Sequence, residues 1–181
     1  MGARGEKEAA AIRPQASRTA RRMGMGSSNL LSRQGHRLLQ VGVALFLFTS
    51  FEGFVIPYFP VPNLGRSVHT LSSFLGVLLL ALGLVWPRLN LGATAARIAF
   101  WLLIYSGLAI VAAFLLGAVW GAGNSIMPLA AGSAHGSDFQ EAVIRLVAYS
   151  SAPTGIASFA LILWGLRGPP VADGGAQRMG E

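Results

Sequence analysis

The side chain best suited to chemistry in this sequence is a histidine placed among small residues within an apolar segment. His69 lies at the start of the apolar stretch 68–86, and on a helix it shares a face with Ser72, Ser73, Gly76, Leu80 and Gly83. A face of small residues either lets a neighbouring helix approach closely or makes room for a flat cofactor. In the second case, His69 is placed to bind haem iron as an axial ligand.

Two charged residues within apolar segments are further candidates for a binding or catalytic site. Glu52 lies about one turn before the end of the stretch 38–58. There it can pair with Arg66, hydrogen-bond within the bundle or take part in catalysis. Arg145, in the stretch 143–166, can extend to the membrane surface or bind a carboxylate such as a haem propionate. Charged side chains are costly to keep in lipid, so each needs a partner or a function.

Two tyrosines add hydroxyl groups to the same segments. Tyr105 lies in the middle of the stretch 98–120, and Tyr149 lies one helical turn after Arg145. A phenol in such a place is more often a structural hydrogen-bond donor than a catalytic acid. A structural role and a catalytic role both stay open for these tyrosines.

Four apolar stretches must position these residues. They run over about 38–58, 68–86, 98–120 and 143–166, and each has the ~20 residues that a helix needs to cross a bilayer. The chain is 53% hydrophobic and only 12% charged, whereas a soluble domain has ~25% charged residues. The sequence therefore predicts an all-α fold, an integral membrane bundle of four transmembrane helices.

Proline, glycine and tryptophan mark the predicted helix ends. The first helix is predicted to begin near Arg37 and to end at a proline cluster from Pro57 onward. The next three end at Trp86, Trp120 and Leu166. Trp86, Trp120 and Trp164 have the positions of interfacial anchors. The predicted parts are a disordered basic tail over 1–32, the membrane domain over 33–168 and a polar tail over 169–181.

The distribution of positive charge predicts the orientation. Eight of the fourteen Lys and Arg residues lie in 1–37, where no aromatic residue is interleaved, so we expect no nucleic-acid partner. The segment 87–97 and the C-terminal tail each carry two arginines, the segment 59–67 carries one, and 121–142 carries none. The positive-inside rule then places both termini in the cytoplasm and the protein in the cell inner membrane as a multi-pass protein.

Composition excludes several kinds of site. The chain has no cysteine, which excludes disulfides, iron–sulfur clusters and thiol nucleophiles. Its three histidines, His36, His69 and His135, have no spacing typical of a zinc site. A transporter or channel subunit is disfavoured because the few intramembrane charges show no repeat and no ion path.

Several motifs in order resemble the hydroxylaminobenzene mutase family, which is related to the membrane-bound styrene oxide isomerases. They are Gln34-Gly35-His36-Arg37-Leu38-Leu39, Ser67-Val68-His69, Gly83-Leu84-Val85-Trp86-Pro87-Arg88-Leu89, Phe100-Trp101-Leu102-Leu103-Ile104-Tyr105, Val119-Trp120-Gly121-Ala122-Gly123, Met127-Pro128 and Leu163-Trp164-Gly165-Leu166-Arg167. The resemblance covers about residues 33–168.

This resemblance implies a homotrimer of four-helix subunits with haem b between them. The histidine that holds the haem matches His69, and Tyr105 matches a helix-three tyrosine that contacts the substrate oxygen. Ferric haem would act as a Lewis acid in a redox-neutral isomerisation of a small aromatic substrate. The mutases convert an arylhydroxylamine to an aminophenol, and the isomerases convert an epoxide to an aldehyde. Glu52 and Arg145 are further pocket candidates.

One position departs from the isomerase pattern. The isomerases have an asparagine six residues after the haem histidine, where this chain has Leu75. Because leucine cannot hydrogen-bond to a substrate oxygen, the alternative hypothesis is a non-catalytic membrane protein of the same fold.

Overall fold

The computed structural model describes the backbone of residues 3–167 and the side chains of residues 29–167. The described residues form helices and no strand. The elements are α1 (Ala3–Val55), η1 (Ile56–Tyr58), α2 (Pro62–Val85), η2 (Trp86–Arg88), α3 (Ala93–Trp120), α4 (Pro128–Ala131) and α5 (Asp138–Leu166). Segments 29–58, 62–88, 93–120 and 138–166 are long and apolar enough to cross a membrane. The predicted all-α fold with four transmembrane helices is confirmed, and the chain is a multi-pass membrane protein.

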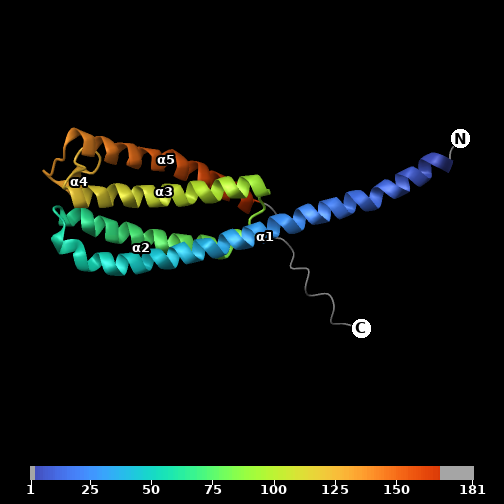
Figure 1. Cartoon of the computed structure of the whole chain (residues 1–181), viewed down its shortest axis with the longest axis horizontal. Helices are drawn as coiled ribbons and strands as arrows, with labels where there is room; N and C mark the ends of the chain where they lie inside the picture. The colour runs from blue at the N-terminus through green and yellow to red at the C-terminus, as the bar shows by residue number, and fades with distance from the viewer. Residues whose placement is uncertain (1–2, 168–181) are drawn as a thin grey trace.

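The four long helices are arranged as two pairs. Helix α1 packs along α2, α3 packs along α5, and contacts between α2 and α3 join the two pairs. Figure 1 also shows the N-terminal part of α1 extending beyond the ends of the other helices. This arrangement brings residues of α1 and α2 that are far apart in sequence to the same level of the bundle.

Reciprocal glycine contacts hold α1 against α2. A Cβ atom added at Gly83 would lie 2.9 Å from the carbonyl oxygen of Gly35, and one added at Gly42 would lie 2.9 Å from that of Gly76. Glycines on both helices therefore let the two backbones touch, as small residues do in membrane proteins. At Gly76 and Gly83 the face of small residues serves helix packing, and α1 fills the space that a flat cofactor would need.

We expect Gly83→Ala to destabilise the fold by about 1–3 kcal/mol, because backbone atoms that cannot easily shift occupy the place of the new methyl group. Thermal unfolding in mild detergent measures the loss. Gly92→Ala is a matched control, because a Cβ atom at Gly92 would meet nothing within 4 Å. Equal melting temperatures for the two variants would show that the glycine contact is unimportant.

Two predicted features at one end of the bundle are wrong, and they have a common cause. Helix α1 does not begin near Arg37, because Leu31 and Gln34 are buried against other helices and the helix continues through them. Trp86 is fully buried and is therefore no interfacial anchor. Its indole Nε1 donates a hydrogen bond to Gln34 Oε1 at 3.2 Å, which satisfies the one polar atom of the ring.

The predicted division into tails and a membrane domain is only partly within the described residues. Helix α1 passes residue 32 without a break. The disorder predicted for 1–32 stays a prediction, since side chains are described only from Asn29. The predicted polar tail over 169–181 lies outside the described residues.

A buried carboxylate organises the connection between α3 and α5. Helix α3 ends at Trp120 and is followed by Gly121, whose φ of 65° suits a glycine. Helix α5 begins with a capping box between Ser137 and Gln140. Glu141 accepts hydrogen bonds from the backbone N–H of Gly123 at 2.7 Å and from Ser125 Oγ at 2.6 Å. These contacts give Glu141 a structural role.

Candidate functional site

The structure brings His69 and Glu52 together between α1 and α2. The Nδ1 atom of His69 lies 3.1 Å from Oε2 of Glu52. The imidazole also packs on Gly53, where an added Cβ would lie 3.3 Å from His69 Cε1. Of the alternatives for Glu52, hydrogen bonding within the bundle is therefore the one observed, while Arg66 donates a hydrogen bond to Asn63 instead.

Exposure differs sharply within this pair. The Glu52 side chain is 2% exposed and the His69 side chain is 43% exposed. The carboxylate is thus enclosed by the subunit, whereas part of the imidazole faces outward. A ligand that approaches from outside the subunit can reach His69 but not Glu52.

Three polar atoms beside the pair lack partners. Glu52 Oε1, Thr49 Oγ1 and Ser72 Oγ are buried and form no hydrogen bond. Thr49 lies one turn before Glu52 on α1 and Ser72 one turn after His69 on α2, so in antiparallel helices both lie one turn deeper in the bundle. A buried polar atom without a partner costs about 1–3 kcal/mol. Such a cluster is typical of a place that holds water or a polar ligand group.

The His69 environment fits an axial haem ligand. A metal-bound histidine usually donates its other ring N–H to a carboxylate, which fixes the tautomer and the ring orientation, and Glu52 is placed to accept that bond. No described residue hydrogen-bonds to Nε2 of His69. Because α1 fills the space at Gly76 and Gly83, a haem on His69 would lie on the exposed side of the ring and not between α1 and α2. Among the described residues, no group of three His, Cys, Asp or Glu is placed to hold a metal ion unaided.

Tyr105 lies apart from the pair within one subunit. Its hydroxyl is 2.7 Å from Ser150 Oγ on α5. Leu75 contacts Gly107, which fixes the level of α2 against α3. At 1.5 Å per residue along two antiparallel helices, His69 and Tyr105 are then about 12 Å apart along the bundle. The contact of Tyr105 with a substrate oxygen stays a prediction.

Arg145 and Leu75 also lie away from His69. Arg145 is exposed on α5 and forms no hydrogen bond or ion pair with a described residue, so its place in a pocket stays a prediction. A Cβ atom at Gly107 would lie 2.7 Å from Leu75 Cδ1. Leu75 therefore packs α2 onto α3.

Thr49 was not among the residues predicted from the sequence, and Ser72 was predicted only as one of the small residues on the face of His69. Both lie three residues from a candidate site residue, which is one helical turn. That spacing was the available signal. That spacing becomes informative only when the face of α1 that packs against α2 is known.

Comparison with known proteins identifies the family. The styrene oxide isomerase family model matches residues 34–167, a range that contains His69 and Glu52. The chain belongs to the styrene oxide isomerase family. Membership supports an isomerase-type activity in a membrane protein, and it confirms the resemblance drawn from the sequence motifs.

Two curated proteins are similar to the chain over most of its length. Hydroxylaminobenzene mutase HabB of Ectopseudomonas oleovorans is 43% identical over 134 residues, which are 74% of this chain and 82% of HabB. Hydroxylaminobenzene mutase HabA of the same organism is 33% identical over 129 residues, which are 71% of this chain and 96% of HabA. The comparison with solved structures gave no significant match.

Proposed function

We propose that this protein is a haem-dependent membrane isomerase that converts an arylhydroxylamine to an aminophenol. What supports this choice over epoxide isomerisation is the 43% identity to a hydroxylaminobenzene mutase over 82% of that protein. The observation that carries the haem proposal is the half-exposed His69, whose Nδ1 lies 3.1 Å from a buried carboxylate.

The reaction is balanced without an oxidant or a reductant. The N–O bond of the hydroxylamine breaks and a C–O bond to the ring forms. The ring carbon loses a proton and the nitrogen gains one. The barrier falls when the departing oxygen is polarised in a site that excludes bulk water. An apolar bundle also suits an aromatic substrate that partitions into lipid.

Each residue of the site has a defined part in this proposal. His69 would hold haem iron through Nε2, and bound ferric haem would supply a Lewis acid for the substrate oxygen. Glu52 accepts the Nδ1–H bond of His69 and so fixes the ring, which makes it a positioning residue.

We also propose that the protein is a homotrimer in the cell inner membrane with both termini in the cytoplasm. The exposed part of His69 leaves one side of a bound haem to be covered by another subunit. Tyr105, about 12 Å along the bundle from His69, stays the candidate for the contact with the substrate oxygen.

The decisive experiment is to purify the protein in mild detergent with haem supplied, record its visible spectrum and then assay two substrates. We expect a Soret band and an aminophenol from hydroxylaminobenzene with no added oxidant or reductant. Aldehyde from styrene oxide without aminophenol would assign the other reaction of the family. A folded, colourless and inactive protein would favour the non-catalytic alternative.

A further inference from the structure

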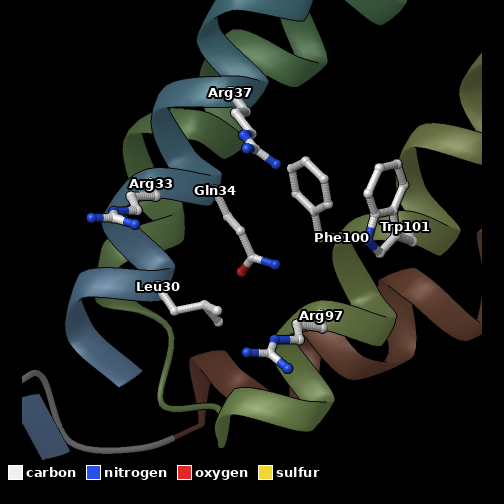
Figure 2. A pocket seen from close by; sticks show the side chains of 7 residues that line it. All are labelled: Leu30, Arg33, Gln34, Arg37, Arg97, Phe100 and Trp101. Atoms are coloured by element: carbon white, nitrogen blue, oxygen red, sulfur yellow. The ribbon is translucent and has the colours of Figure 1, made fainter. Parts of the chain in front are cut away.

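A second polar site lies at the other end of the helix bundle, where residues in the middle of α1 face the start of α3. The hollow has a volume of about 260 Å³ and combines arginines with apolar and aromatic side chains. It is lined by Leu30, Arg33, Gln34, Arg37, Arg97, Phe100 and Trp101. Figure 2 shows Arg37 and Arg97 extending from the two helices toward the space between them, with Gln34 in the middle; the Arg33 side chain extends from α1 on the side away from Gln34.

The positive charge of this hollow is not neutralised by any described residue. Arg33, Arg37 and Arg97 are exposed, and none forms an ion pair or hydrogen bond within residues 29–167. The carboxylates described in that range are Glu52, Asp138 and Glu141, all at the other end of the helices. The guanidinium groups of Arg37 and Arg97 repel each other across the hollow unless an anion lies between them, so the hollow is suited to an anionic ligand.

The floor and wall of the hollow are held in place by buried contacts. Gln34 is 7% exposed, and its side chain accepts a hydrogen bond from Trp86 and donates one to the carbonyl oxygen of Ala96. The Phe100 ring packs edge-on against Trp86 and Trp101, with centroid distances of 6.2 and 5.3 Å. The arginines therefore extend from a rigid surface, which lowers the entropic cost of binding.

This hollow is separate from the site at His69. Arg37 and Glu52 are fifteen residues apart on α1, which is about 22 Å along a helix. Arg33 and Arg97 also lie within the first turns of the membrane spans that begin at residues 29 and 93. A ligand bound here is thus at the depth of lipid headgroups.

We propose that Arg37 and Arg97, with the positive charge of Arg33 beside them, bind the phosphate of an anionic phospholipid, with its acyl chain against Phe100 and Trp101. Guanidinium groups suit phosphate oxygens because they donate paired hydrogen bonds. The apolar wall favours a lipid over free phosphate, because Trp101 is 62% exposed and offers its ring to an acyl chain. Basic pockets between transmembrane helices bind anionic headgroups in this way.

Native mass spectrometry of the full chain in detergent tests the proposal, with phosphatidylglycerol and phosphatidylcholine supplied at equal concentrations. We expect phosphatidylglycerol to be retained preferentially. Each of Arg33→Gln, Arg37→Gln and Arg97→Gln should weaken its binding about fivefold, which corresponds to the attraction of one basic side chain for an anionic surface.

The matched control is Arg66→Gln combined with Arg145→Gln, since these exposed arginines lie at the other end of the bundle. The control should leave lipid binding unchanged, and Arg97→Lys should retain most of it. Equal retention of the two lipids, or equal losses in the control and test variants, would overturn the proposal. Inorganic phosphate binding as tightly as the lipid would also overturn it. Haem content and isomerase activity are not read in this experiment, so its outcome is independent of the proposed function.

Discussion

Replacing His69 with alanine is expected to abolish the Soret band of the purified protein and to lower isomerase activity by at least 10²–10³-fold. The imidazole is the proposed iron ligand, and the loss of a group that stabilises charge on a reacting oxygen has an effect of that size. The ring is 43% exposed and packs on Gly53, so its removal should leave the helix pairs assembled. Visible absorption and product formation measure the two effects.

The matched control is His135→Ala. His135 is an exposed histidine in the connection between α3 and α5, and its loss should leave the spectrum unchanged. A His69→Ala protein that retains its full haem content would refute the ligand assignment. Haem loss in both variants, with a lower melting temperature, would indicate damage to the fold.

The helices were predictable from the sequence because a bilayer fixes the length that an apolar segment must have. All four transmembrane helices were found in this way, and the end of α3 at Trp120 and that of α5 at Leu166 agree with the structure. The start of α1 was missed because hydropathy falls where the helix leaves lipid, although its backbone hydrogen bonds continue. Beyond that point, the side chains of Leu31 and Gln34 are still buried against other helices.

The pairing of His69 with Glu52 could not be predicted from spacing along either helix. It depends on the register of α1 against α2, which the contacts of Gly35 with Gly83 and of Gly42 with Gly76 set. The sequence shows which residues are small but not which of them meet. The face of small residues on α2 could therefore serve either helix packing or cofactor binding until the contact between α1 and α2 was known.

The arginine hollow was hidden from the sequence for a related reason. Arg33, Arg37 and Arg97 each counted toward the orientation of the helices, and nothing in their spacing joins α1 to α3. They meet because Gln34 links Trp86 to the backbone of Ala96. Trp86 looks like an interfacial anchor from its place at a helix end, but this contact buries it.

Glu52→Gln is expected to keep haem bound but to lower isomerase activity about 10–100-fold, the usual effect of losing the partner of a metal-bound histidine. Glutamine has the shape of glutamate and can still accept the Nδ1–H bond of His69, but it carries no charge. A neutral acceptor makes the imidazole a weaker donor to ferric iron, so the reduction potential of the haem should rise. Redox titration of the Soret band measures that shift.

The change in potential separates a positioning role from a structural one. If Glu52 only fills space, Glu52→Gln would leave both the melting temperature and the potential where they were. Thr154→Val is the control, because the Thr154 hydroxyl lies on α5 and donates to the backbone oxygens of Ser150 and Ser151. Replacing that hydroxyl by a methyl group of similar size should leave both the spectrum and the potential unchanged. An unchanged potential in Glu52→Gln would mean that the carboxylate does not act on the iron through His69.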